Sequence, residues 1–419
     1  MNYDVTLPVT TEMAEGREED LEKALTWTES GQSVLKLNIR HLWLFGLWPL
    51  YESSAFQLYT VYVYILALWN FTECLLTVYF AWGDMDEVTL VIMSTASHLN
   101  GLIKMMFFHY DRRRYNALTR RVAALLSIQS EVCDRESPMA AIVDSSQRHA
   151  FRLSLSLVLF MFAQCFVWFP MPLYTQPETR RLPFAQHAWD NNSNLYGLSY
   201  FAQCSAGLWT TQISFGLDCL FASAMILVTA QLDILARRIL ALKYDTYNEK
   251  DEQSEKRPVA KFGDKMYNDL CLCVESHQKI LSFVSQLQDT MSPIAMSEFF
   301  FSVLVICLGL FQATFNEDLG AVFECASFLP IPCAHVFLYC WAANSVTVQA
   351  EALSVAAYSC SWMEASERFK RAMRILISRA QKPLILTAGH LYPIDKKAFV
   401  SLVNASYSYY ALLSQTNKR

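Results

Sequence analysis

Seven stretches of the chain are apolar enough and long enough to cross a lipid bilayer, and more polar segments separate them. Each stretch is close to the roughly 20 residues that a membrane-spanning helix requires. The fourth is overlong, and its polar end after Gln231 predicts that the helix continues into the cytosol. The pattern predicts an all-α integral membrane protein with seven transmembrane helices, at residues 56–80, 88–110, 153–173, 196–235, 293–315, 321–347 and 397–415.

The segments around these spans differ in character. Residues 35–50 combine Leu, Trp and Phe with Arg40, a pattern typical of a short helix at the membrane surface. Apolar residues recur at helical spacing between residues 262 and 289, which predicts an amphipathic helix that leads into the fifth span. The predicted regions are an amino-terminal segment with the surface helix (1–55), spans one to four (56–244), a cytosolic loop with the helical extension (245–292), spans five and six (293–347), a cytosolic anchor (348–395), and span seven with the carboxy-terminal end (396–419).

Positive charge is distributed unevenly among the connections. Lys and Arg gather in the amino-terminal segment and in the connections after spans two, four and six. Because positive residues collect on the cytosolic side, we predict a cytosolic amino terminus and an extracellular carboxy terminus. No signal peptide begins the sequence. The sequon at Asn191 then lies in an extracellular loop, so we predict glycosylation there.

The composition agrees with the membrane class and excludes several others. Of 419 residues, 53% are hydrophobic and only 17% are charged, which is too apolar for an ordinary soluble protein. A net charge of -5 is not the strongly basic balance that is typical of a nucleic-acid-binding protein. Most of the 12 cysteines fall in apolar runs and are expected to be small core residues, and Cys271 and Cys273 have no partners at zinc spacing. No HExxH, GxSxG or P-loop motif occurs, so we expect no enzymatic activity, metal or cofactor.

Several ionisable residues nevertheless fall inside the predicted spans. Asp218 and Glu298 are of a type that is rare in membrane helices, and they indicate polar contacts or a water path. A purely structural pair inside the bundle is an equally good interpretation. His98 and His335 are expected to be packed, hydrogen-bonded residues rather than bases or metal ligands.

A cavity for a volatile apolar ligand is predicted among the middle and outer parts of spans two to six. Aromatic and sulfur side chains supply burial and dispersion, while a few hydroxyl and amide groups set the orientation of the ligand. Pro330 and Pro332 would kink span six and make a cavity easier to form there. Plain helix packing remains the alternative for each single residue. The predicted lining is Met93, Ser97, Met161, Gln164, Cys165, Trp168, Phe201, Cys204, Ser205, Trp209, Phe300, Phe301 and Phe328.

The carboxy-terminal part of the sequence resembles the insect odorant receptor family. The resemblance lies in residues 379–389 (RAQKPLILTAG), followed by Tyr392-Pro393, Phe399 and residues 406–410 (SYSYY). His390 departs from the pattern, which has a second glycine there. Residues between spans six and seven also fit the family, namely Tyr339, Cys340, Asn344, Glu351, Ala357, Tyr358 and Trp362. The second cytosolic loop lacks the long insertion typical of the family's co-receptor, so the resemblance implies a ligand-tuned subunit.

The resemblance also implies a function. Such a subunit assembles with the odorant co-receptor into a heterotetrameric, odorant-gated, nonselective cation channel in the plasma membrane, expected in olfactory sensory neuron dendrites. Spans four to seven are then expected to meet in a cytosolic anchor, and span seven to line the pore, with a gate at Leu412, Gln415 and Thr416.

Two alternatives remain open. A gustatory-receptor-like homotetramer is disfavoured by the Ser-Tyr-Ser-Tyr-Tyr sequence of span seven. A transporter is disfavoured because the chain has no inverted repeat, and a metabotropic receptor by the predicted cytosolic amino terminus.

Overall fold

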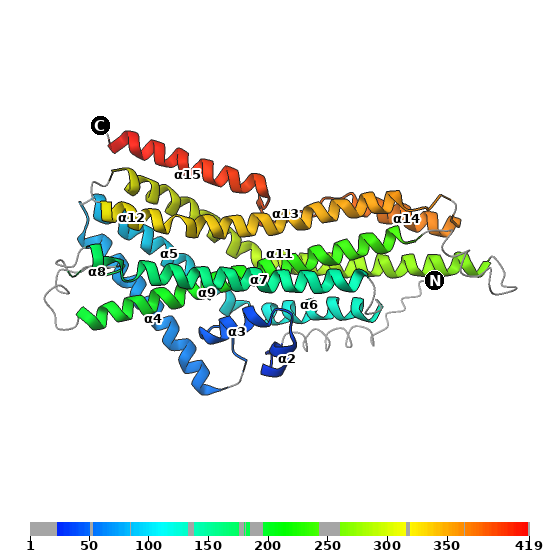
Figure 1. Cartoon of the computed structure of the whole chain (residues 1–419), viewed down its shortest axis with the longest axis horizontal. Helices are drawn as coiled ribbons and strands as arrows, with labels where there is room; N and C mark the ends of the chain where they lie inside the picture. Colours follow the sequence, from blue (N-terminus) through cyan, green and yellow to red (C-terminus); the bar gives the residue numbers. More distant parts are fainter. Residues whose placement is uncertain are drawn as a thin grey trace, which may run out of the picture.

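The structure is a computed structural model that describes residues 23–50, 53–83, 85–132, 138–175, 180, 182–184, 196–242, 260–315, 319–363 and 365–417. Most of the long helices run roughly along the longest axis of the molecule, while α4 lies oblique to it (Figure 1). The long helices are α4 (Ser54–Phe80), α5 (Met85–Tyr110), α7 (Pro138–Trp168), α9 (Tyr196–Leu240), α11 (Ala260–Phe315), α13 (Pro330–Ser359) and α15 (Lys396–Asn417). The shorter elements are α2 (Trp27–Gln32), α3 (Lys36–Leu44), α6 (Arg112–Val132), α8 (Met171–Thr175), α12 (Leu319–Phe328), α14 (Glu367–Ala380), β1 (Thr387–Ala388) and β2 (Tyr392–Pro393).

The predicted all-α, seven-helix architecture is confirmed. Six of the described helices are long and apolar enough to cross a membrane. The seventh, α15, is more polar, but its 22 residues span roughly 33 Å at ~1.5 Å per residue, enough for a hydrocarbon core of about 30 Å. Because seven is an odd number of crossings, the chain enters the first span and leaves the last on opposite sides of the membrane.

Two boundaries differ from the sequence prediction. The predicted extension and the fifth span form one continuous helix, α11, in which Pro293 is accommodated. The predicted sixth span is instead divided at Leu329, where α12 ends and α13 begins with Pro330. Proline is favoured at the first position of a helix because its missing N–H would have no partner there. Leu329 nevertheless keeps helical φ and ψ of -54° and -36°, and its N–H donates to the Cys325 carbonyl at 3.2 Å, so the chain stays helical up to Pro330, as in a helix kinked at proline.

Helix α9 is the centre of the bundle. It packs against α3, α4, α5, α6, α7, α11 and α13, and 89% of its most apolar window is buried. Small side chains permit this close packing. A Cβ atom at Gly216 would lie only 2.9 Å from His41 and from Leu42 of α3. The predicted surface helix thus forms as α3, but its inner face, including Ile39 and Leu42, is buried beneath α9.

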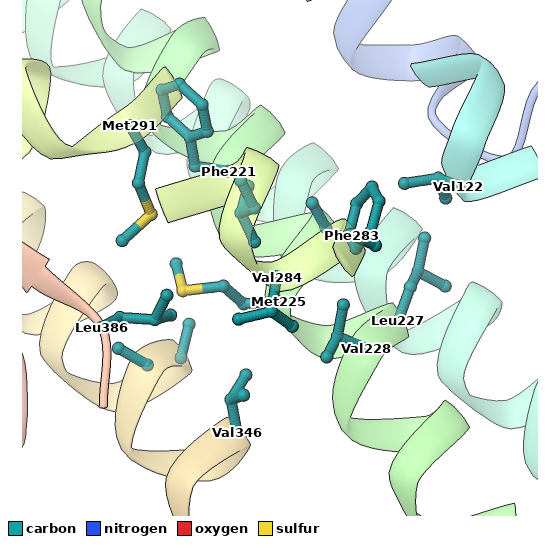
Figure 2. Packing of buried hydrophobic residues seen from close by; sticks show 14 of the residues in the cluster. Val122, Phe221, Met225, Leu227, Val228, Phe283, Val284, Met291, Val346 and Leu386 are labelled. Atoms are coloured by element: carbon teal, nitrogen blue, oxygen red, sulfur yellow. The ribbon is translucent and has the colours of Figure 1, made fainter. Parts of the chain in front are cut away.

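One large apolar core joins the elements at the end of the bundle that also carries α14 (Figures 1 and 2). Phe283 of α11 lies among side chains of α6 and α9, and Val346 of α13 lies near Leu386. All three side chains are at most 2% exposed. Close packing of this kind makes the end of the bundle a rigid unit. It corresponds to the helical anchor that the sequence predicts.

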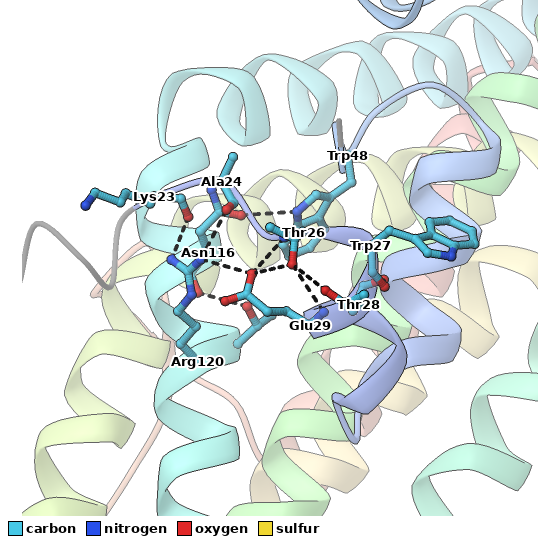
Figure 3. A network of polar contacts seen from close by, with 11 residues as sticks. Lys23, Ala24, Thr26, Trp27, Thr28, Glu29, Trp48, Asn116 and Arg120 are labelled. Carbon is cyan, nitrogen blue, oxygen red and sulfur yellow. Dashed lines mark hydrogen bonds and ion pairs between the residues drawn. The ribbon is translucent and has the colours of Figure 1, made fainter. Parts of the chain in front are cut away.

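The start of the described chain is fastened to α6 by a polar network (Figure 3). Thr26 and Glu29 form a reciprocal capping box at α2, with Thr26 N donating to Glu29 Oε2 at 2.7 Å. Arg120 of α6 donates to the carbonyls of Lys23 and Ala24, at 2.7 and 3.1 Å. The Thr26 backbone N–H, with a smaller contribution from Arg120, holds the pKa of Glu29 below its usual value.

A two-stranded hairpin connects the anchor to α15. Its turn residues Gly389 and His390 both have positive φ, at 60° and 56°, as a tight hairpin turn requires. The hairpin docks on α11, where Gln288 exchanges hydrogen bonds with Thr387 and Ser292 accepts from the backbone of Gly389 and His390. These bonds fix where α15 begins relative to α11.

Candidate functional site

A cavity of about 100 Å³ lies inside the bundle, between α5, α9, α11, α12 and α13. Its wall combines aromatic and aliphatic side chains with an unusually large share of hydroxyl, amide and ionisable groups. The lining residues are Ser94, Ser97, His98, Asn100, Phe184, Thr210, Thr211, Ser214, Glu298, Phe301, Ser302, Val305, Phe328, Ile331, Pro332 and His335. For scale, a dry cavity of ~150 Å³ accommodates benzene.

Local sequence explains why space remains at this point. Small residues stand where the helices meet, and a Cβ atom at Gly101 of α5 would lie only 2.3 Å from Thr210 Cγ2 of α9. Ser94 and Ser97 turn their hydroxyls back onto carbonyls of their own helix, at 3.4 and 3.0 Å. The break before Pro330 lets α12 and α13 each contribute to the wall. Short side chains and a divided helix together leave the volume unfilled.

A cluster of two acids and two bases adjoins the cavity, and two of its members, Glu298 and His335, form part of the cavity wall. Lys104 Nζ lies 2.8 and 2.7 Å from the two carboxylate oxygens of Asp218 and 2.5 Å from Glu298 Oε2. His335 Nδ1 lies 2.5 Å from Asp218 Oδ2 and 3.4 Å from Glu298 Oε1. All four side chains are at least nine-tenths buried. Their charges offset one another, so the cluster can exist in the apolar bundle.

Neutral side chains complete the hydrogen bonding of the two carboxylates. Tyr339 OH donates to Asp218 Oδ1 at 2.8 Å. Asn100 Nδ2 donates to Glu298 Oε2 at 2.8 Å, and Ser302 Oγ donates to Glu298 Oε1 at 2.9 Å. The cluster thereby links α5, α9, α11 and α13 across the middle of the bundle. The Asp218 and Glu298 singled out in the sequence share this one network.

Asp218, Glu298 and His335 also have the composition of a metal site, with one possible ligand atom from each within 4.8 Å of the others. Lys104, however, already places its ammonium group between the two carboxylates. That ammonium supplies the positive charge that a metal ion would bring, and removing it from the cluster would require moving a fully buried side chain. The arrangement fits an ion-paired core and not a metal centre.

The predicted ligand-binding residues fall into three groups. Ser97, Phe301 and Phe328 line the cavity directly. Met93, Met161, Gln164 and Trp168 lie behind this wall. The Trp168 ring is tilted against that of Phe328, with ring centroids 5.8 Å apart, and Gln164 donates to the Ser327 carbonyl. Cys165, Phe201, Cys204, Ser205, Trp209 and Phe300 do not line this cavity.

The residues of the third group have other contacts. Phe201 and Phe300 are 71% and 64% exposed on the outside of the bundle. Trp209 donates to Tyr59 OH at 2.9 Å, on the side of α9 that faces α4. Ser205 donates to the Phe201 carbonyl within its own helix. Aromatic character alone therefore does not distinguish a cavity wall from a lipid-facing surface.

Sequence reasoning missed most of the polar wall. Asn100, Thr210, Thr211 and Ser214 were not predicted, although all four line the cavity. Part of the signal was present as helical spacing, because residues 94, 97 and 98 and residues 210, 211 and 214 each lie on one helix face, whereas Asn100 lies off the first of these faces. A search for apolar ligand contacts passes over such hydroxyl-rich faces.

The predicted pore residues lie on α15, which the rest of the chain covers on one side only. Ser406 is fully buried toward the bundle, and Tyr410 OH donates to Thr314 of α11 at 3.2 Å. Leu412 is 60% exposed, and Gln415 is exposed as well. Thr416 belongs to the helix, but its side chain is outside the described residues, as is the predicted glycosylation site Asn191.

Comparison with known proteins gives consistent results. A family model described as 7tm Odorant receptor matches residues 84–407. Odorant receptor 10 of Aedes albopictus is 25% identical over 338 residues, covering 80% of this chain and 85% of that protein. Odorant receptor Or2 of Anopheles gambiae is 23% identical over 387 residues, covering 91% and 97%. The solved structure of the olfactory receptor OR5 from Machilis hrabei in complex with eugenol has a TM-score of 0.76 at 18% identity, covering 91% of this chain and 97% of that one.

Proposed function

This chain belongs to the 7tm odorant receptor family, and from that premise we propose that it is a ligand-tuned subunit of an odorant-gated, nonselective cation channel. It is a multi-span membrane receptor and not an enzyme. In the proposal it assembles with the odorant co-receptor as a heterotetramer in the plasma membrane of olfactory neuron dendrites. The amino terminus is cytosolic, and Asn191 carries a glycan on the extracellular side.

The observation that carries this proposal is that one helix, α11, contacts both the cavity and the proposed pore helix α15. Glu298 and Phe301 of α11 line the cavity. The same helix holds the hairpin before α15 through Gln288 and Ser292, and it packs along α15 itself. A ligand that shifts α11 therefore has a direct mechanical route to α15.

The composition of α15 supports a place beside water. Its exposed positions include Ser401, Asn404, Ser408 and Gln415. Such side chains are costly against lipid and are favourable against an aqueous pore or a neighbouring subunit. Leu412 and Gln415, followed by Thr416, lie at the carboxy-terminal end of the helix, where the gate is proposed.

Gating follows from differential binding. An odorant in the cavity opens the channel only to the extent that it binds the open conformation more tightly than the closed one. The packed anchor provides a fixed base against which the membrane halves of α11 and α15 can move. In this mechanism the ion cluster ties α11, at Glu298, to α5, α9 and α13, and the part of the α11 wall beyond that point, at Phe301 and Val305, adjusts to the ligand.

The test is expression of the chain with and without an odorant co-receptor, with whole-cell currents recorded against a broad panel of volatile compounds. Ligand-evoked cation currents that require both subunits would support the proposal. Currents from the chain alone would favour a homotetramer. Ligand responses that require G-protein signalling and carry no direct current would contradict the channel assignment.

Phe301→Ala in the cavity wall gives the matched test of the site. Removing the ring takes away ligand contacts, and we expect the dose–response curve to move to higher concentration by about tenfold or more. Ser205→Ala, on the same side of the membrane but outside the cavity, is the control and should leave the curve in place.

A further inference from the structure

We propose that the cavity selects a compact, neutral molecule that carries a hydroxyl group, such as a phenol or a small alcohol, in preference to a hydrocarbon or an amine of equal size. The inference rests on the proposed function for its physiological role, but its chemistry comes from two buried polar atoms. Asn100 and Thr210 line the cavity, and their Oδ1 and Oγ1 atoms are buried without a hydrogen-bond partner within the described part of the chain.

The orientation of the Asn100 amide is fixed by its neighbour. Glu298 can only accept from it, so the amide nitrogen must be the group that lies 2.8 Å from Glu298 Oε2. The carbonyl oxygen then points away from the carboxylate as an acceptor without a donor. Asn100 is only 7% exposed, so bulk water does not easily supply that donor. A ligand N–H or O–H would.

The hydroxyl group of Thr210 differs from those of other threonines in helices of this chain. Thr95, Thr229 and Thr290 are buried or half-buried helical threonines, and each donates to the carbonyl four residues earlier, at 2.7–2.9 Å. Thr210 is 4% exposed, yet its hydroxyl makes no such bond. Its methyl group lies against Gly101, the residue after Asn100. The two unpaired atoms therefore belong to neighbouring positions across the α5–α9 contact.

A hydroxyl group complements this pair better than other small polar groups. It can donate to Asn100 Oδ1 and accept from Thr210 Oγ1 at the same time. An ether or ester only accepts, and would leave the Asn100 oxygen unpaired. Because the Asn100 oxygen is buried and unpaired before binding, a ligand with a donor gains a hydrogen bond there that a ligand without one cannot make.

The neighbouring charges argue for a neutral ligand. Lys104 and His335 already face Asp218 and Glu298, two bases for two acids. Each carboxylate oxygen has a donor or base within 3.4 Å in the cluster. An ammonium ligand would find no carboxylate without a partner, and it would add an uncompensated charge inside the bundle.

The rest of the wall limits the size and shape of the ligand body. Phe184, Phe301 and Phe328 supply three aromatic rings. They suit an apolar ring through dispersion and edge contacts. At about 100 Å³ the cavity is smaller than the ~150 Å³ that accommodates benzene, so it admits a short chain as it stands and a single ring only with a small outward movement of the wall.

The experiment compares three ligands that have the same carbon ring and the same number of heavy atoms. Cyclohexanol is neutral with a hydroxyl, methylcyclohexane has no polar group, and cyclohexylamine is cationic at neutral pH. Phenol and toluene form a second pair with an aromatic ring. Binding is measured by thermal stabilisation of the purified chain in detergent, and gating by current in cells that also express the co-receptor.

We expect the hydroxyl compounds to bind and to activate about three- to tenfold more strongly than their hydrocarbon and amine partners. Thr210→Val keeps the shape of the side chain and should abolish most of that preference. Thr229→Val, on the same helix with its hydroxyl bonded to Met225, is the control and should retain it. Because the Thr210 hydroxyl has no partner, its removal should not lower the melting temperature of the ligand-free chain.

The outcomes separate the two proposals. Hydrocarbon binding equal to hydroxyl binding, or a preference unchanged in Thr210→Val, would overturn the inference even if the channel conducts. A hydroxyl preference in binding with no ligand-evoked current would sustain the inference and remove the channel function. Stronger binding of cyclohexylamine would show that the cluster presents net negative charge to the ligand and would also overturn the inference.

Discussion

Helices α4 and α15 both present exposed faces, but the two faces differ in chemistry. Along the apolar window of α4 only 28% of residues are buried, and the exposed side chains include Leu58, Ile65 and Leu76. The exposed positions of α15 instead include Ser401, Asn404 and Ser408, interspersed with Val400, Tyr407, Tyr409 and Leu412. Lipid covers an aliphatic face at no cost, whereas amide and hydroxyl groups need water or protein. The difference is the one that the proposal requires, in which α4 faces lipid and α15 faces a pore or another subunit.

The same difference appears in how each helix is held. Helix α4 packs along α5 and α9 inside the subunit. Helix α15 contacts α11 and α13, and a hairpin pinned to α11 fixes its start. A helix attached firmly at one end and uncovered along one side is suited to small movements. This is the behaviour expected of a gate-bearing helix.

The largest loss of stability is expected from disrupting the buried ion cluster inside the bundle against which both helices pack. Lys104→Met leaves Asp218 and Glu298 as buried carboxylates without their main partner, which costs about 3–5 kcal/mol. We expect most of the chain to aggregate on extraction, as measured by size-exclusion chromatography in detergent. Lys279→Met removes only an exposed pair with Glu275 and should cost no more than about 0.5 kcal/mol. Equal yields of the two variants would contradict the buried cluster.

A charge placed on each exposed face would test the comparison directly. Ile65→Lys puts an ammonium near the middle of α4 against lipid, at a cost of about 3 kcal/mol in membrane insertion. Asn404→Lys puts the same group on the exposed polar side of α15, where insertion should be nearly unaffected. Insertion is measured by the topology of a glycosylation tag placed after each helix. If both variants insert equally well, α4 does not face lipid.

These contrasts show what the sequence could predict. Hydrophobic length and charge distribution were sufficient for the number and order of the crossings, because a bilayer imposes the same requirement on each span. The division at Leu329 could not be predicted, since Pro330 fits equally well inside a kinked helix or at the start of a new one.

The ligand site was harder to predict than the fold. Phe301 lines the cavity, but Phe300 beside it faces outward with 64% exposure. Neighbouring residues on a helix point about 100° apart, which is enough to turn one side chain inward and the next outward. In a helix that is apolar on all sides, the sequence does not show which face is which. Lys104 was overlooked because a single lysine in a span gives no indication of its partners on α9 and α11. His390 stands where a glycine fits better, and the turn adopts positive φ nonetheless.

The smallest effect is a pH dependence at the amino-terminal capping box, far from both exposed faces. The pKa of Glu29 is lowered by the Thr26 backbone N–H, so the folded state binds a proton less readily than the unfolded segment. The contribution of this cap is therefore present above the ordinary glutamate value of about 4.3 and is lost as pH falls through the lower folded value. Hydrogen exchange in α2, corrected for intrinsic rates, should show more opening in that acidic range. In Glu29→Gln this pH dependence should disappear, and a dependence that survives would assign it to another group.

The central claim is that α15 borders the permeation path, and single-channel recording of the heteromer with Gln415→Lys tests it most directly. An ammonium group beside a cation pathway repels the permeating ions, so the account predicts a lower unitary conductance with ligand sensitivity retained. Unitary conductance and cation selectivity both equal to those of the unaltered channel would contradict it.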